Sequence, residues 1–374
     1  MWLARLSRGF ASVQLPLVPF PVHKLDAKVF PTTAETTREE VLHYLKDMLT
    51  IRRIEITSDN YYKNKDIRGF CHLCDGQEAV AVGMEGALTK QDCLITAYRV
   101  HGQAYMRGET PRAIFAEMFG RVTGSSKGKG GSMHFYNKDT NFYGGNGIVG
   151  AQVSVGAGLA FALKYENKPN VAAIMYGDGA ANQGQVAEAS NMAALWHLPA
   201  MFICENNRYG MGTSTKRAAA NTLYYTRGDP IPGFLIDGQN VFQVREGFKF
   251  AKKWALEHGP IFVEINTYRY HGHSMSDPGT TYRSREEVDG VRSHQDPIEV
   301  LKSLAFAQKL VSEEEVKDME KSIRKTVEEA AKQAHEDPWP TSQDLFTDVY
   351  DSSVKSKSYV DELRDVEVTH KVVV

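Results

Sequence analysis

The sequence predicts a doubly wound α/β fold with a mostly parallel central sheet. Two apolar runs, 171–176 and 200–205, have the length of buried strands and enclose a helical stretch at 185–196. Two strands joined by a helix form a βαβ unit, whose strands are parallel. A further apolar run lies at 261–270, and strands that alternate with helices indicate a sheet with helices on both faces.

The first helix is expected to begin near Thr36 and Thr37. Each of these threonines has a glutamate three residues later, Glu39 and Glu40, which is the spacing of a capping box. Apolar residues then recur at helical intervals as far as Ile54, as they do on the buried face of a helix. This segment is expected to form a helical N-terminal extension of the sheet domain.

Further elements follow along the chain. Residues 75–78 open a helix of small residues, and 93–97 has the composition of a buried strand. Thr110 and Pro111 supply a cap and a first-turn proline for another helix. From 297 to about 335, charged and apolar residues alternate at helical spacing, which predicts amphipathic C-terminal helices packed on the outside.

Charge and composition exclude several classes of protein. The 374 residues carry 44 Lys+Arg against 46 Asp+Glu, a net charge of −2, so no basic surplus favours nucleic-acid binding. No apolar run approaches the roughly 18 to 20 residues of a membrane span. The four cysteines are too few for a disulfide framework, and the Cys71–Cys74 pair lacks the second pair that a structural zinc site needs.

The N-terminal segment, residues 1–25, contains three basic residues and no acid. This composition is typical of an organelle-import presequence, and arginines interrupt the apolar core that a secretory signal would need. We expect a protein of the mitochondrial matrix, cut before Asp26, with the α/β domain over 26–340 and a C-terminal tail over 341–374. An N-terminus that is merely frayed is the alternative.

Glycines are concentrated between Gly120 and Gly158, which enclose 11 of the chain's 31 glycines. Such a stretch is either a flexible linker or a backbone shaped to approach a ligand closely. This stretch also contains Met133–Tyr136 and Ile148–Val149, whereas linkers are polar and featureless. We therefore expect a binding loop.

Two nucleotide-binding signatures are not matched. The dinucleotide pattern G-x-G-x-x-G fails at Gly177, where Asn182 takes the sixth place, and at Gly156, where Phe161 does. The P-loop pattern fails at Gly128 because the required earlier glycine is absent. An NAD-binding oxidoreductase thus remains an alternative, although its G-x-G-x-x-G signature is not matched.

Polar residues end two successive predicted strands. Gly177–Asp178–Gly179 follows the first strand, and Asn206–Asn207 follows the second. In a parallel sheet both positions lie at the carboxyl edge, where ligands bind. Carboxylate and amide oxygens suit Mg²⁺ or Ca²⁺, and the glycines and the next helix N-terminus would admit a diphosphate. Gly-Asp-Gly alone is more often a plain turn, but together the two motifs predict a metal–diphosphate site.

These two motifs, separated by 26 residues, resemble the thiamine diphosphate motif. The resemblance covers residues 30–335 and includes seven segments in the same order and spacing: FCHLCDGQEA (70–79), AYRVHG (97–102), KGKGGSMH (127–134), FYGGNGIVGAQ (142–152), MYGDGAANQGQ (175–185), ICENNRYGMGTS (203–214) and TYRYHGHSMSDPG (267–279). The chain is similar to the alpha subunits of the first component of mitochondrial pyruvate dehydrogenase complexes, in the thiamine diphosphate-dependent 2-oxoacid dehydrogenase family.

The resemblance implies a thiamine diphosphate-binding fold and a role for each matching residue. The Mg²⁺ ligands would be Asp178, Asn207 and the main-chain carbonyl of Tyr209. The diphosphate would be contacted by Tyr98, Arg99 and His273 and approached by Gly179 and Ala180. Gly147 and Val149 would pass along the aminopyrimidine ring. His72 and His273 would lie near the reacting carbon as catalytic residues.

The resemblance also implies partners. A beta subunit would supply a glutamate to the aminopyrimidine, so that the active protein is a heterotetramer of two alpha and two beta chains docked on a lipoyl-bearing acetyltransferase core. Ser274 and Ser214 resemble sites of inhibitory phosphorylation, which implies a regulatory kinase and phosphatase. Ser276 lies in the same loop, and Thr280–Thr281 stands where a further regulatory serine is expected.

Alternatives remain at this stage. The alpha subunit of a branched-chain 2-oxoacid dehydrogenase is disfavoured because its loop resembles HHSTSDDS, whereas this chain has HGHSMSDPG. An acetoin dehydrogenase is more distant, and the import-like N-terminus argues against it. A non-catalytic subunit that only binds partners is disfavoured because all the cofactor positions are filled.

Overall fold

The computed structural model describes residues 12–348. Its strands are β1 (Val13–Pro16), β2 (Val22–His23), β3 (Thr33–Thr36), β4 (Cys93–Ala97), β5 (Phe142–Asn146), β6 (Ala172–Gly177), β7 (Ala200–Asn206), β8 (Tyr209–Gly210), β9 (Thr213–Ser214), β10 (Gly233–Asp237) and β11 (Ile261–Asn266). Its α-helices are α1 (Arg38–Lys63), α2 (Glu78–Glu85), α3 (His101–Met106), α4 (Pro111–Met118), α5 (Ala151–Tyr165), α6 (Gly184–Leu195), α7 (Thr215–Ala218), α8 (Val241–His258), α9 (Arg285–Gln295), α10 (Pro297–Ala307) and α11 (Glu313–Glu336). Short 3₁₀ helices lie at Ala27–Val29, Lys138–Thr140, Ala180–Asn182, Tyr224–Thr226 and Ser342–Phe346.

The centre of the fold is a seven-stranded sheet in the order β2-β10-β11-β7-β6-β4-β5. Every pair is parallel except β2 with β10, at one edge. The predicted βαβ unit is present, since β6 and β7 are neighbours joined by α6. The mostly parallel, doubly wound sheet is therefore confirmed.

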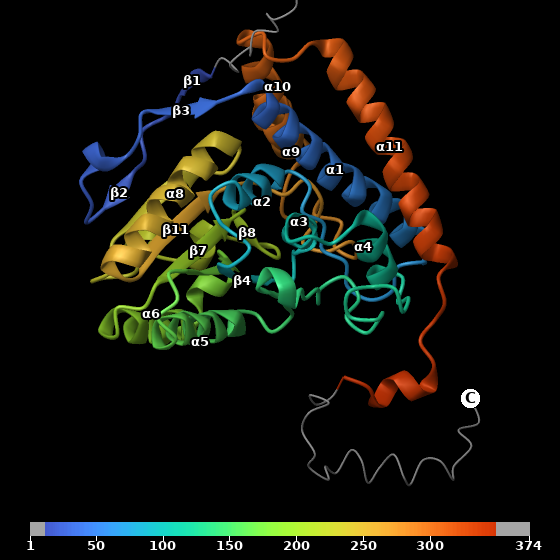
Figure 1. Cartoon of the computed structure of the whole chain (residues 1–374), viewed down its shortest axis with the longest axis horizontal. Coiled ribbons are helices and arrows are strands. Elements are labelled where there is room, and N and C mark those ends of the chain that lie inside the picture. Colours follow the sequence, from blue (N-terminus) through green and yellow to red (C-terminus); the bar gives the residue numbers. More distant parts are fainter. Residues whose placement is uncertain (1–11, 349–374) are drawn as a thin grey trace, which may run out of the picture.

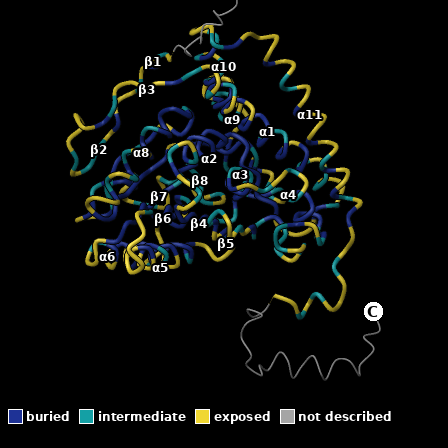
Figure 2. Tube along the Cα trace, viewed as in Figure 1, coloured by how far each residue is buried: buried dark blue, intermediate teal, exposed yellow. Residues whose placement is uncertain are grey.

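Helices cover both faces of the sheet (Figure 1). Along β6, Ile174 and Tyr176 belong to a core cluster with α5 and α6, whereas Ala173 and Met175 belong to a cluster with α1, α2 and α8. Successive strand residues point to opposite faces, so an apolar residue at every position is what a strand buried on both sides requires. Figure 2 shows the resulting buried centre.

Local signals placed the helix starts well. The side chain of Thr37 accepts a hydrogen bond from the Glu40 amide at the start of α1, and Thr110 caps α4 with Pro111 in its first turn. The amphipathic segment near the C-terminus forms two helices, α10 and α11, rather than one continuous helix. A capping box formed by Ser312 and Glu315 starts the second helix, which runs along α1 on the outside (Figure 1).

Three features were not predicted. Strand β5 forms inside the glycine-rich stretch. Strand β11 ends at Asn266, shorter than the predicted 261–270, because the chain then turns away and the Tyr270 amide donates to the Asp75 carbonyl. Near the N-terminus, Leu15 and Phe20 are buried in the core, although both fall within the segment expected to be a presequence.

In the part of the chain described here, none of the helices combines the length and apolar character needed to cross a membrane. All four cysteines are buried and unbonded to one another.

Candidate active site

The tips of β6 and β7 bring Asp178 and Asn207 to the same edge of the sheet. Gly177 pairs with Glu205 in the parallel register, and the two site residues follow just beyond that pair. The turns that they begin touch each other, since a Cβ added to Gly210 would lie 3.1 Å from the Cα of Gly179. Only glycines allow so close an approach between the two backbones.

A cavity of about 280 Å³ opens at this edge. Its lining consists of Ala97, Tyr98, Arg99, Val149, Gln152, Gly177, Asp178, Gly179, Ala180, Glu205, Asn207, Tyr209, Gly210, Met211 and His273. Every residue predicted to bind the cofactor or metal is in this set except Gly147. Residues from five separate motifs of the sequence therefore meet in one cavity.

Two oxygen atoms in the cavity wall lack partners. Oδ2 of Asp178 and Oδ1 of Asn207 are buried and form no hydrogen bond within residues 12–348. Burial raises the pKa of Asp178 to about 6, because a desolvated carboxylate is unfavourable without compensation. A divalent cation would compensate both oxygens and reverse this shift. The chemistry of the pair therefore fits a hard cation such as Mg²⁺.

Three aromatic rings cluster beside the cavity. The ring of His72 lies 4.4 Å from that of Tyr98 and 5.3 Å from that of His273. Burial, reinforced by the positive charge of Arg99, lowers the pKa of His72 to about 2 and that of His273 to about 4. Both imidazoles are therefore neutral near pH 7, and each has a buried Nδ1 atom without a hydrogen-bond partner in the described part of the chain.

Two distant segments hold these histidines together by running antiparallel. The Tyr270 amide donates to the Asp75 carbonyl at 3.1 Å, and the Met275 amide donates to the Cys71 carbonyl at 2.8 Å. Arg99 joins the same segments, since its guanidinium donates to the carbonyls of Leu73 and, at 2.9 Å, His273. Arg99, expected at the diphosphate, thus also fixes the backbone of the site.

Four of the predicted residues lie outside the cavity lining. One is His72, whose ring lies beside the cavity, 4.4 Å from that of Tyr98. A Cβ added to Gly147 would lie 3.6 Å from Nε2 of His134, so this glycine faces the glycine-rich loop. Ser274 is buried, with its Oγ 2.9 Å from that of Ser276. Ser214 is partly exposed in the short strand β9.

Glu205 lines the cavity and was not identified from the sequence. Burial, with a smaller contribution from the charge of Asp178, raises its pKa to about 7. Its place at the tip of β7, immediately before Asn206–Asn207, is the signal that could have identified it, because strand tips at the carboxyl edge face ligands.

Comparisons with known proteins identify chains of similar sequence. The profile of the dehydrogenase E1 component family matches residues 46–343. "Pyruvate dehydrogenase E1 component subunit alpha, mitochondrial" from Solanum tuberosum is 54% identical over 352 residues, which cover 94% of this chain and 90% of the relative. The somatic-form mitochondrial alpha subunit from Homo sapiens is 54% identical over 348 residues, covering 92% and 88%.

A match of this extent, over a fold and a cavity that agree with it, settles the family. The chain belongs to the dehydrogenase E1 component family, and within it to the family of pyruvate dehydrogenase alpha subunits.

Proposed function

We propose that this chain is the alpha subunit of a mitochondrial pyruvate dehydrogenase E1 component. With a beta subunit it catalyses oxidative decarboxylation of pyruvate and reductive acetylation of a lipoyl group. The observation that carries the proposal is the pair of unpartnered oxygens on Asp178 and Asn207 at adjacent strand tips, in a chain more than half identical to such subunits. The names of these relatives favour pyruvate over branched-chain 2-oxo acids.

The dehydrogenase E1 component family depends on thiamine diphosphate. When bound, this cofactor supplies the nucleophilic carbon and the electron sink for loss of carbon dioxide from a 2-oxo acid. In our proposal Asp178, Asn207 and the Tyr209 carbonyl hold Mg²⁺. Arg99 lies in the same cavity wall and stabilises the negative charge of the diphosphate.

We assign proton transfer near the reacting carbon to His72 and His273. Burial and Arg99 lower their pKa values, so both imidazoles are neutral near pH 7. In our proposal, the negative charge of the bound diphosphate offsets that of Arg99 and raises these pKa values towards neutrality, where a histidine transfers protons efficiently. Tyr98 packs against both rings and keeps them in place. Gly179, Ala180 and Val149 line the same cavity. The first two would leave room for the diphosphate beside the backbone, and Val149 would lie along the aminopyrimidine.

The beta subunit is expected to cover the open side of the cavity. Ile148 is 72% exposed and Val149 44% at that rim, and they lead directly into α5. The outer side of α5 and α6 continues the exposed apolar surface with Val155, Phe161, Tyr165, Met192, Leu195 and Trp196. A surface of this kind marks a protein interface. We propose that it carries the beta subunit in a heterotetramer of two alpha and two beta chains, docked on the lipoyl acetyltransferase core.

Regulation by a kinase and a phosphatase is proposed for Ser274 and Ser214. Ser274 lies next to His273, where a phosphate of about −1.5 to −2 charges would repel the diphosphate and disturb the loop. Because Ser274 is buried, this loop must open before a kinase can reach it.

For the presequence we propose a cut before Val13. Strand β1 begins at Val13 and pairs with β3, and Leu15 and Phe20 belong to the core. Removal of those two side chains would cost core stability, so a cut nearer to Asp26 is disfavoured.

The decisive experiment is co-expression with candidate beta subunits, followed by decarboxylation assays with pyruvate and with branched 2-oxo acids. We expect Mg²⁺- and thiamine diphosphate-dependent turnover of pyruvate. Preference for branched substrates would support the branched-chain alternative, and an assembled but inactive complex would indicate a subunit that only binds partners.

A further inference from the structure

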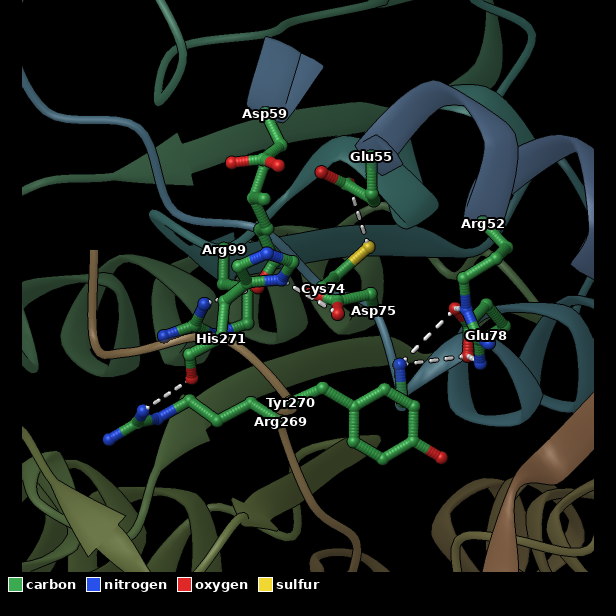
Figure 3. A network of polar contacts seen from close by, with 12 residues as sticks. Arg52, Glu55, Asp59, Cys74, Asp75, Glu78, Arg99, Arg269, Tyr270 and His271 are labelled. Atoms are coloured by element: carbon green, nitrogen blue, oxygen red, sulfur yellow. Dashed lines mark hydrogen bonds and ion pairs between the residues drawn. The ribbon is translucent and has the colours of Figure 1, made fainter. Parts of the chain in front are cut away.

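Asp75 occupies the junction between the two antiparallel segments of the site, yet it is not part of the cavity wall. It is buried, with 2% of its surface exposed. Its Oδ2 lies 2.8 Å from Nδ1 of His271. Figure 3 shows this pair between the helix that carries Glu55 and the loop that carries Tyr270. His271 lies two residues before His273. The contact with Asp75 therefore holds the loop that carries His273.

The turn that presents Asp75 has little freedom to move. Gly76 has a φ of +94°, and a Cβ there would lie 2.5 Å from the Tyr268 carbonyl oxygen, so no other residue fits without displacement. The Gly76 amide donates to Oε2 of Glu78 at 3.0 Å. Arg52 in turn holds Glu78 and contacts Asp296 at 3.0 Å. The carboxylate of Asp75 is therefore presented from a fixed support (Figure 3).

Beneath His271, the partner loop is supported mainly by its own arginines. Arg269 and Arg283 each donate to the His271 carbonyl, at 2.9 and 2.7 Å, and these bonds lie within the same loop. Arg269 also donates to the Met211 carbonyl at 2.9 Å. Across to the segment that carries His72, the contacts near this point are the ion pair of Asp75 with His271, the backbone bonds from Tyr270 and Met275, and the Arg99 bridge to the Leu73 and His273 carbonyls. Of these, the ion pair is the one that the His271 side chain makes.

We propose that Asp75 is a positioning residue, which acts through its ion pair with His271 to hold His273 against His72. This inference rests on the proposed function, because it assigns His273 to the reaction. Loss of the pair would leave every cavity-lining residue in the chain but would let the loop carrying His273 move away. A displacement of about 1 Å at a reacting group can cost roughly 100-fold in rate.

The charges around the pair set its pH range. The carboxylates of Asp75, Asp59 and Glu55 face His271, while Arg52 and Arg99 face Asp75. Burial opposes the charged imidazole, but the hydrogen bond and charge of Asp75 outweigh it and raise the pKa of His271. For a raised histidine pKa, the stabilisation is complete below about pH 6.5 and is lost as pH rises through the folded-state value. The loop should therefore loosen on the alkaline side.

The test uses the alpha–beta complex saturated with thiamine diphosphate and Mg²⁺, with the variants Asp75→Asn and His271→Gln and the double variant. Each single change should lower kcat by roughly 10- to 100-fold with little change in the KM for pyruvate. The double variant should be no worse than the worse single variant, because both remove the same interaction. Hydrogen exchange over residues 271–283 should be faster in all three. After correction for intrinsic exchange, the exchange rate of the wild-type complex should rise with pH towards that of the variants. The corrected rates of the three variants should not change with pH.

The matched control is Asp66→Asn, which removes a second His–Asp contact. Asp66 lies 3.1 Å from His335, and neither residue lines the cavity. It should leave both kcat and exchange over 271–283 unchanged. Wild-type kcat and exchange in Asp75→Asn or His271→Gln, or losses that multiply in the double variant, would overturn the inference. If the wild-type complex does not turn over pyruvate, the proposed function fails instead, and the exchange comparison still decides whether the pair holds the loop.

Discussion

At the scale of single residues, the site depends on two oxygen atoms that the fold buries without a partner. Oδ2 of Asp178 and Oδ1 of Asn207 face one cavity from adjacent strand tips. An unpaired buried carboxylate destabilises a folded chain, which is consistent with the raised pKa of Asp178. Selection for stability would not keep such a group, so a ligand explains it better.

Replacement of Asp178 by Asn should therefore separate binding from folding. We expect affinity for thiamine diphosphate in the presence of Mg²⁺ to fall by more than about 100-fold, since even outer-sphere partners of a metal contribute 10- to 100-fold. The melting temperature of the cofactor-free complex should not fall, because an unfavourable buried charge is removed. Titration and thermal unfolding measure the two effects, with the exposed Asp289→Asn as control. Unchanged affinity would refute the metal assignment.

At this scale the sequence predicted most of the residues that line the cavity, but not all of the contacts that they make. Spacing was sufficient for Asp178 and Asn207, because strand order followed from one βαβ unit. Glu205 was not identified, because the recognised pattern was the Asn206–Asn207 pair that follows it. The bonds from Arg99 to the carbonyls of Leu73 and His273 were unpredictable, because they join segments about 200 residues apart in the chain.

At the scale of elements, α5 is close to the sheet because one glycine permits it. A Cβ added to Gly156 would lie 2.6 Å from Cγ1 of Ile174 on β6. Replacement of Gly156 by Val should push the helix outward and destabilise the fold by about 1–3 kcal/mol, measured by denaturant unfolding of the complex. Gly290→Ala in α9, where a Cβ meets open space, should instead be neutral or stabilise by up to about 1 kcal/mol. Equal effects at the two positions would contradict the packing argument.

The loop that follows β11 gives a second prediction at this scale. Ser274→Glu places a bulky charge in a buried position, whereas the neighbouring Ser276 is exposed. We expect Ser274→Glu to reduce turnover of pyruvate at least tenfold while assembly with the beta subunit is retained. Ser276→Glu should have a much smaller effect. The ratio of kcat to assembled complex is the measurement, and full activity of Ser274→Glu would count against the proposed regulatory site.

Local signals fixed the ends of elements more reliably than their lengths. The caps at Thr37 and Thr110 depend on side chains within three residues, which a sequence displays directly. The end of β11 at Asn266 depends on a contact with the turn at Asp75, and β5 depends on pairing with β4. Such contacts between distant segments leave no local pattern.

At the scale of the whole molecule, the exposed apolar side chains on the outer side of α5 and α6 form the interface proposed for the beta subunit. Phe161→Asp would place a charge in the centre of the proposed interface, where its desolvation is costly. We expect association with the beta subunit to weaken at least tenfold, or about 1.4 kcal/mol. Sedimentation of the co-purified subunits measures it. Leu256→Asp, equally apolar and exposed but on α8, is the matched control, and equal effects of the two changes would show that another surface carries the partner.

The fold class and the family could be read from the sequence alone, which also predicted Asp178 and Asn207 as a pair of metal ligands. These depend on short-range patterns: apolar runs of strand length, glycines beside an aspartate, and motifs in a fixed order. The folded chain was needed to show that the rings of His72 and His273 lie together, that Arg99 joins their segments, and that Asp75 pairs with His271. Each of these depends on how two stretches about 200 residues apart pack together, and such packing is set by the whole core rather than by any neighbouring residue.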